Sequence, residues 1–207
     1  MVKYLSWFSL LVLFGSGVLL PEIVGVIQDG YSPIGNYLSE LGAIGAPHAM
    51  LINYGSFLPI GLAVIILVFA LYQKFSNFPM ARLGILFLLG IAIGYLGAFF
   101  FHCDAGCPEQ GTGRQALHNL GGLIEYTGAI TGLLLIYFAT RKQASRAFAN
   151  ATLFTVSMVI LGFVMMLSLE MSEWKGAWQR LAEYMLVAWF VYAVFWQPSL
   201  DKTEIET

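Results

Sequence analysis

The sequence predicts an all-α membrane protein whose six transmembrane helices form one domain over residues 1–207. The chain is 58% hydrophobic and 11% charged, and its mean hydropathy is +0.76. Its apolar runs are roughly twenty residues long, which is the length that a helix needs to cross a hydrocarbon core about 30 Å thick. A soluble fold would need a polar exterior that this composition does not provide. A nucleic-acid partner is excluded because the ten Lys and Arg residues form no basic stripe.

Six apolar runs define the expected spans, and short polar segments separate them. The first run follows Lys3, as in a secretory signal, but it is too long and shows no small-x-small cleavage site, so we expect a retained helix. The spacing Leu-x-Asn-x-Gly recurs at residues 51–55 and 117–121, which leaves a repeat of three helix hairpins open. The expected spans are about Tyr4–Ile27, Met50–Tyr72, Ala81–Phe101, Leu120–Thr140, Ala151–Leu169 and Leu181–Trp196.

Positive charges concentrate in alternate connections, which predicts the orientation of the chain. The connections on one side contain Lys3, Lys74, Arg82, Arg141, Lys142, Arg146 and Lys202. Those on the other side contain only Arg114, Lys175 and Arg180. The positive-inside rule therefore predicts an inner (plasma) membrane protein with both termini in the cytoplasm. Three loops then face outward, at about residues 28–49, 102–119 and 170–180, and they contain all three histidines and both cysteines.

The second outer loop, within the sequence FHCDAGCPEQGTGRQALHN, holds the densest group of reactive side chains. Cys103 and Cys107 are expected to form a disulfide, because Gly106 and Pro108 favour a tight bend and the outer compartment is oxidising. A metal site remains the alternative, since imidazole and thiolate are ligands of zinc and copper. Its ligands would come from the two cysteines and from His102, His118 and Asp104. The cofactor is therefore undefined, with a divalent metal as the candidate.

Two acids are expected within the membrane. Glu125 shares a helix face with His118 and with glycines spaced three, four and seven residues apart, so this face should pack against protein. Glu125 then lies about 10 Å deeper than His118. Glu22 follows Pro21 in the first span. An ionisable group at such depth is a functional hypothesis by default. Arg180 and Glu183 are expected to line the same polar cavity, with Arg180 as a counter-ion or phosphate ligand.

The first outer loop contains turn signals followed by a short amphipathic segment. Residues 36–41 are expected to form a short helix with Tyr37, Leu38 and Leu41 against the membrane. Ser39 and Glu40 would then face the water-filled site.

The loop motifs resemble those of a known family. The segments YSPIGNYLSELGA and FHCDAGCP, Asn53, the pair His118-Asn119 and the segment WQR before the last span are similar to DUF998, a six-helix membrane family of unknown function. More distantly, the chain resembles the eukaryotic DRAM and Frag-type proteins, although Glu40 replaces the aspartate of their motif and CDAGCP has no counterpart there. That remote likeness implies a role in lipid remodelling.

We expect one outward-facing site that binds or converts a lipid headgroup by acid/base or metal-assisted chemistry, as a hydrolase or transferase would. In this hypothesis His118 is the base or a ligand, Asp104 orients it and Arg180 holds a phosphate. Two alternatives stay open: a proton-coupled transporter that uses Glu22 and Glu125, and a non-enzymatic sensor or assembly factor. Membrane lipids are the expected partners, and the sequence defines neither the substrate nor the oligomeric state. The expected site comprises Ser39, Glu40, Asn53, His102, Asp104, His118, Asn119 and Arg180, with Glu22 and Glu125 beneath them.

Overall fold

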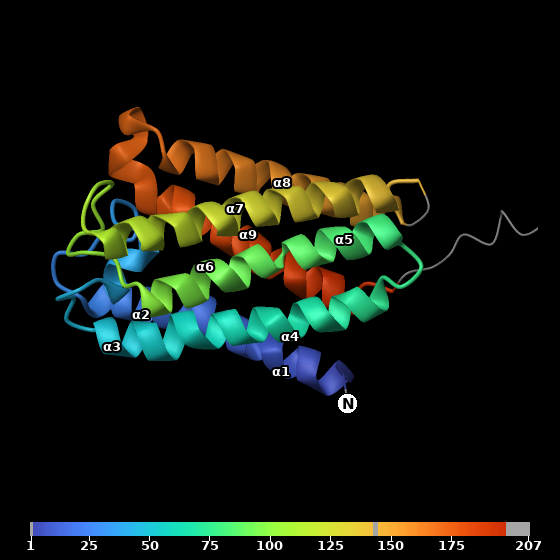
Figure 1. The fold of residues 1–207 in the computed structure, drawn as a ribbon, viewed down its shortest axis with the longest axis horizontal. Helices are drawn as coiled ribbons and strands as arrows, with labels where there is room; N and C mark the ends of the chain where they lie inside the picture. The colour runs from blue at the N-terminus through green and yellow to red at the C-terminus, as the bar shows by residue number, and fades with distance from the viewer. Residues whose placement is uncertain (1, 143–144, 198–207) are drawn as a thin grey trace, which may run out of the picture.

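The computed structural model describes residues 2–142 and 145–197, and every regular element within those ranges is a helix. In Figure 1 the helices run side by side along the long axis of the molecule. Three longer connections gather at one end, called the loop end: the first loop (residues 28–48), the second loop (101–112) and the third loop (167–174). The N-terminus and the short turns between α4 and α5 and between α7 and α8 lie toward the opposite, turn end.

Thirteen elements follow one another in the described ranges, and several of them join into continuous helices. They are α1 Val2–Phe14, the π-helix η1 Gly15–Leu19, α2 Leu20–Ile27, the 3₁₀-helix η2 Leu38–Gly42, α3 Ala49–Ile52, the π-helix η3 Asn53–Phe57, α4 Leu58–Lys74, α5 Pro79–Phe87, α6 Leu89–Phe100, α7 Gly113–Thr140, α8 Arg146–Met166, the 3₁₀-helix η4 Leu169–Trp174 and α9 Lys175–Phe195.

Within the part of the chain that the structure describes, five helical segments are long and apolar enough to cross a membrane: Lys3–Ile27, Ala49–Lys74, Pro79–Phe100, Gly113–Thr140 and Arg146–Met166. The sixth long helix, α9, has 21 residues and carries Lys175, Arg180 and Glu183 in its first half. The prediction of an all-α, multi-pass membrane protein is therefore confirmed, with five to six helices that qualify as spans.

The helix boundaries at the loop end differ from the predicted ones. α7 begins at Gly113 rather than Leu120, and α9 begins at Lys175 rather than Leu181. The Thr112 side chain accepts a hydrogen bond from the Gln115 N–H and so caps α7. These first turns are polar, and hydropathy does not separate a polar first turn from a loop. His118, Asn119 and Arg180 therefore lie on helices rather than in loops.

Two π-helices face each other where the first two spans meet. A proline follows each of them, Pro21 in α2 and Pro59 in α4. Proline has no N–H to donate, so it leaves a backbone carbonyl of the preceding turn without its helical partner. The Ser16 carbonyl of η1 instead accepts a hydrogen bond from Ser56 Oγ of η3 (2.7 Å). π-helical turns are frequent at functional sites, and these two border the cavity described below.

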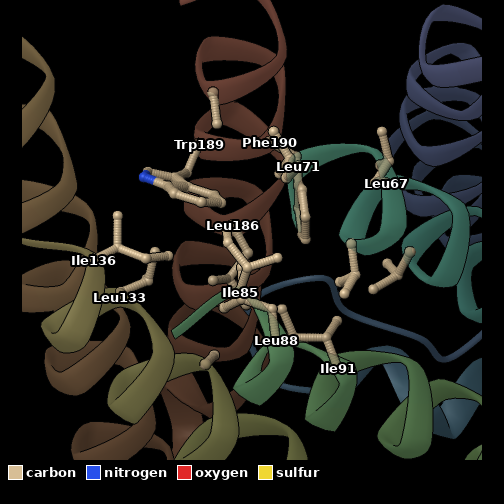
Figure 2. Close-up of a cluster of buried hydrophobic side chains, with 14 of the residues drawn as sticks. Leu67, Leu71, Ile85, Leu88, Ile91, Leu133, Ile136, Leu186, Trp189 and Phe190 are labelled. Carbon is tan, nitrogen blue, oxygen red and sulfur yellow. The ribbon is translucent and has the colours of Figure 1, made fainter. Parts of the chain in front are cut away.

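The turn half of the bundle is filled mainly by apolar side chains. Figure 2 shows Leu67 and Leu71 of α4 near Phe190 of α9, with side chains of α5, α6 and α7 around them. Their exposed fractions are close to zero, so this half is closely packed. The core includes Ile85, Leu88, Ile91, Leu133, Ile136, Leu186 and Trp189.

Glycines allow α7 to lie directly against α5 and α6. A Cβ atom at Gly90 would lie 3.2 Å from the Gly128 Cα, and one at Gly132 would lie 2.6 Å from the Gly84 carbonyl oxygen. Close approach of backbones at small residues is a common mode of helix packing in membranes. The prediction that the glycine face of this helix packs against protein is confirmed.

Candidate functional site

A cavity of about 60 Å³ lies inside the bundle toward the loop end. Its wall combines η1, η3, α6, α7 and α9, and the first loop contributes Leu38 and Ser39. One water molecule needs roughly 10–15 Å³ of such space, so the cavity has room for a few waters. Its polar lining consists of Ser39, Ser56, Tyr95, His118, Glu125, Tyr126, Gln179 and Glu183.

Two glutamates meet in the wall of this cavity. Glu125 of α7 and Glu183 of α9 are 7% and 4% exposed, and their carboxyl groups interact with each other. Tyr126 donates a hydrogen bond to Glu183 Oε1 (2.5 Å), and Tyr95 donates one to Oε2 (2.9 Å). Glu125 Oε1 is buried and has no hydrogen-bond partner among the residues that the structure describes. Buried polar atoms are nearly always paired, so this carboxyl group is a candidate functional group.

Gly94 of α6 makes room for the Glu125 side chain. A Cβ atom at this position would overlap the Glu125 carboxyl and lie 2.6 Å from its Cβ. Any larger residue would therefore displace the acid or separate α6 from α7. The position of the carboxyl pair thus depends on a glycine of a neighbouring helix.

His118 lines the same cavity, two helical turns or about 10 Å from Glu125. Its Nδ1 lies 3.0 Å from the carbonyl oxygen of Phe101, which can only accept. A neutral imidazole therefore donates from Nδ1 and keeps a lone pair on Nε2. The expected partner, Asp104, does not orient this ring, and the backbone carbonyl takes that role.

Cys103 and Cys107 form a disulfide bond in the second loop, so the disulfide interpretation is confirmed. The bridge lies against the first loop. Ser39 Oγ is 3.4 Å from Cys107 Sγ, and the Ser39 carbonyl oxygen is 3.4 Å from Cys103 Sγ. The Ile44 N–H also donates to the Cys103 carbonyl (3.0 Å). These contacts hold the first and second loops together near the cavity.

The second loop is organised by Asp104 and by two side chains of α7. The Asp104 carboxylate accepts hydrogen bonds from the Thr112 N–H (2.8 Å) and from Thr112 Oγ1 (2.9 Å). Gln115 accepts from the Asp104 N–H (2.7 Å) and donates to Asn119 (2.8 Å). Asn119 in turn donates to the Glu109 carbonyl (3.1 Å). Asp104 and Asn119 therefore hold the loop in place and do not line the cavity.

Arg180 connects α9 to the first span and to the first loop. Its Nε donates to Glu22 Oε1 (2.6 Å), and Tyr184 donates to the same oxygen. Its Nη1 donates to the Pro33 carbonyl (2.7 Å), and Nη2 donates to the Tyr31 hydroxyl (2.8 Å). Burial raises the pKa of Tyr31 above its usual value, although the hydrogen bond from Arg180 offsets part of the rise. With its donors directed at protein acceptors, this guanidinium is not placed to hold a phosphate.

Glu40 and Asn53 shape the first loop. Glu40 accepts hydrogen bonds from Asn36 Nδ2 (2.7 Å) and from the Tyr37 N–H (2.9 Å), and it pairs with Lys175 (3.1 Å). Asn53 donates to the Gly42 carbonyl (2.9 Å) and to the Ala49 carbonyl (2.8 Å).

The short helix of the first loop is the 3₁₀-helix η2, and it does not face lipid as expected. Leu38 and Leu41 are 5% and 0% exposed. The loop folds onto the start of α9, where the Ala177 N–H donates to the Ile34 carbonyl (3.0 Å). Gly176 permits this contact, because a Cβ atom there would lie 2.6 Å from the Pro33 carbonyl oxygen.

The sequence profile of one protein family matches residues 7–196, which span the bundle from α1 to the end of α9. The chain belongs to DUF998, a family described as proteins of unknown function. The family resemblance read from the loop motifs is thereby confirmed. No curated protein and no solved structure matches the chain. The likeness to DRAM and Frag-type proteins stays a prediction.

The structure of this DUF998 protein brings together only part of the predicted site. Ser39, His118 and Glu125 line the cavity together with Glu183, whereas Glu22 is paired with Arg180. His102 is half-buried and does not line the cavity. Sequence reasoning missed Tyr95 and Tyr126. Both could have been noticed as tyrosines inside apolar spans, because a buried tyrosine hydroxyl requires a hydrogen-bond partner.

Proposed function

We propose that this protein performs acid/base chemistry on the headgroup of a membrane lipid, and that the Glu125 and Glu183 carboxyl pair moves the proton. The observation that supports this proposal is the buried carboxyl pair beside a water-sized cavity. Two adjacent carboxyl groups in a low-dielectric site favour a state that shares one proton. Such a pair supplies both an acid and a base within one site.

The two carboxyl groups have different roles in this proposal. Glu183 accepts hydrogen bonds from two tyrosines, and hydroxyl donors favour the ionised form. Glu183 is therefore the base, which takes the proton from an attacking hydroxyl. Glu125 carries the shared proton and gives it to the leaving oxygen, so the net protonation of the pair is unchanged after each cycle. His118 at the loop side of the cavity exchanges protons with water.

A lipid substrate is supported by the surface next to the cavity. An apolar groove of about 750 Å³ is lined by Pro47, His48, Met50, Leu51, Tyr54 and Gly55. Met50, Leu51 and Tyr54 are well exposed. The next residue along η3, Ser56, lines the cavity. One short segment thus borders both a lipid-facing groove and the carboxyl pair. In this proposal the acyl chain lies along the groove and the polar head reaches past η3 to the cavity, whose 60 Å³ admits only the reacting tip of that head.

Transport is supported less well, because the core of the turn half consists mainly of apolar side chains. A path across the membrane needs polar groups or water beyond the carboxyl pair. The core shown in Figure 2 occupies that position with side chains such as Leu88, Leu133 and Trp189. This arrangement favours chemistry that begins and ends at the loop end.

We further propose six spans, with α9 as the sixth, in the plasma membrane and with both termini in the cytoplasm. The turn end carries Lys74, Arg82, Arg141 and Arg146, and α9 pairs its charges within the bundle. Lys202 lies outside the described residues. Fusion of a periplasm-active reporter to the 74–79 turn and to the third loop tests the orientation. Activity only at the loop-end fusion is expected, and activity only at the turn-end fusion contradicts it.

The function is tested by complementing a deletion strain and comparing extracted lipids by mass spectrometry. Wild type is expected to restore a lipid species that changes on deletion, whereas Glu183→Gln and Glu125→Gln are not. Glu173→Gln is the matched control, because Glu173 is an exposed acid of the same loop end. An unchanged lipid profile on deletion, or full restoration by both glutamine variants, refutes the proposal. Infrared difference spectra of the purified variants report whether the protonated carboxyl band belongs to this pair.

A further inference from the structure

Three potential metal-ligand atoms converge at the loop end, and only one of the three residues, His118, also has a role in the acid/base proposal. One ligand atom each from Cys103, Cys107 and His118 lies within 4.8 Å of the other two. Both cysteines are buried, and the histidine is half-buried. A tetrahedral ion with bonds of about 2.0–2.3 Å to nitrogen and sulfur holds its ligand atoms roughly 3.5–4 Å apart. The two sulfurs, bonded to each other here, must therefore move apart on reduction, whereas a His118 ring nitrogen already lies within 4.8 Å of both.

We propose that the reduced form of this cysteine pair binds one thiophilic d¹⁰ cation, Zn²⁺ or Cu⁺, together with His118. In the oxidised form the two sulfurs are bonded to each other and provide no thiolate. A dithiol reductant transfers two electrons to the bridge, becomes a disulfide itself and leaves Cys103 and Cys107 as two thiols. Metal binding then releases both thiol protons.

The surroundings of His118 match those of a metal ligand. Ligating histidines usually donate their second ring N–H to a carbonyl or carboxylate, which fixes the tautomer and the ring orientation. The Nδ1 of His118 already lies 3.0 Å from the Phe101 carbonyl, so the free lone pair is on Nε2. His102, although adjacent to Cys103 in the sequence, is not part of the group.

Ser39 supplies a second feature of such a site. Its hydroxyl lies 3.4 Å from Cys107 Sγ, within the range of a hydrogen bond to sulfur. A hydroxyl donor stabilises a thiolate and so supports a metal–sulfur bond. Three protein ligands leave the fourth position of a tetrahedral ion open to water or to another ligand.

The proposal does not depend on the carboxyl pair, and its test is separate. Full-length protein in nanodiscs is reduced with a phosphine, the phosphine is removed, and Co²⁺ is added as a spectroscopic probe of thiolate ligation. We expect a sulfur-to-cobalt charge-transfer band that saturates at one equivalent and disappears when one equivalent of Zn²⁺ is added. Oxidised protein and protein alkylated after reduction are expected to show no band. A parallel titration with Cu⁺ against a chromophoric chelator identifies which ion binds more tightly.

Two histidine variants decide whether the site has the proposed ligands. His118→Ala is expected to weaken cobalt binding roughly tenfold or more, whereas His102→Ala leaves it unchanged. Circular dichroism and size exclusion establish that the reduced protein remains folded. The proposal is overturned by any of four results: no band in the reduced wild type, equal losses in the two variants, unchanged binding in His118→Ala, or unfolding on reduction. Each result leaves the lipid assay with Glu183→Gln unaffected, so the two proposals fail independently.

Discussion

Replacing Gly94 with alanine should damage the site directly, because the added methyl group meets the Glu125 side chain. The new Cβ atom would lie 2.6 Å from Glu125 Cβ and 2.9 Å from its Cδ, and it would overlap the carboxyl oxygen. The carboxyl group can rotate, but the Glu125 Cβ atom is fixed to the α7 backbone, so rotation of the side chain alone does not relieve the overlap. The helix backbones are also in contact here, since a Cβ atom at Gly121 would lie 3.7 Å from the Gly94 Cα. The methyl group must therefore separate α6 from α7 or displace the acid.

Two opposing contributions determine how much Gly94→Ala lowers the free energy of unfolding. Overpacking of a closely packed core costs roughly 1–3 kcal/mol. Replacing glycine with alanine inside a helix recovers about 0.5–1 kcal/mol of backbone entropy. Gly97 of the same helix provides the matched control, because a Cβ atom there would meet only Gly121 Cα, at an ordinary 3.6 Å. The entropy gain is common to both variants, so Gly94→Ala should be roughly 1–3 kcal/mol less stable than Gly97→Ala.

Unfolding by sodium dodecyl sulfate in mixed micelles, followed by circular dichroism, measures this difference. Glu125→Gly removes the atoms that the new methyl group would meet, so the cost of Gly94→Ala should shrink in that background. Equal stabilities of Gly94→Ala and Gly97→Ala would refute the reasoning. An unchanged cost in the Glu125→Gly background would show that the clash lies with another neighbour.

Two further variants and one chemical reduction test how the loops are held, and the same unfolding measurement is used for all three. Arg180→Gln should lower the free energy of unfolding by about 2–3 kcal/mol, which is less than the usual loss for a broken buried ion pair because the Glu22 carboxylate is 34% exposed. The exposed control Arg114→Gln should change the free energy of unfolding little. Equal effects of the two variants would contradict this prediction. Asn53→Ala should cost about 1–3 kcal/mol through two lost hydrogen bonds to carbonyls, and a neutral result would show that water replaces them. Reduction of the Cys103–Cys107 bridge should lower the free energy of unfolding by about 2 kcal/mol, which is the loop-closure entropy for a separation of four residues. A much larger loss of stability would show that the bridge has a wider structural role.

The spans were predictable because the thickness of the hydrocarbon core fixes the length of an apolar helix. The helix starts at the loop end were not, since the first turns of α7 and α9 are polar. Glu125 could be assigned to the protein interior from the glycines on its helix face. The Cys103 and Cys107 bridge followed from spacing and from the expected compartment.

The contacts of the site could not be predicted, because the sequence does not give the order of helices around the bundle. Tyr95 of α6 and Tyr126 of α7 meet Glu183 of α9 only after these three helices pack together. The same reason explains the first loop. Its apolar residues Leu38 and Leu41 suit a membrane surface as well as a protein interior, and only the docking on α9 decides between them.

The polar side chains at the loop end differ in how much of their hydrogen-bonding capacity is already used. Glu40 and Asp104 each accept several hydrogen bonds or ion pairs from the loops that they organise. Glu125 has an unpaired oxygen, and His118 has a free Nε2 lone pair. A group that binds or protonates a substrate must have capacity left for it, since breaking an existing buried hydrogen bond costs about 1–3 kcal/mol. Unused capacity together with a place in the cavity wall therefore distinguishes Glu125 and His118 from Glu40 and Asp104, which hold the loops.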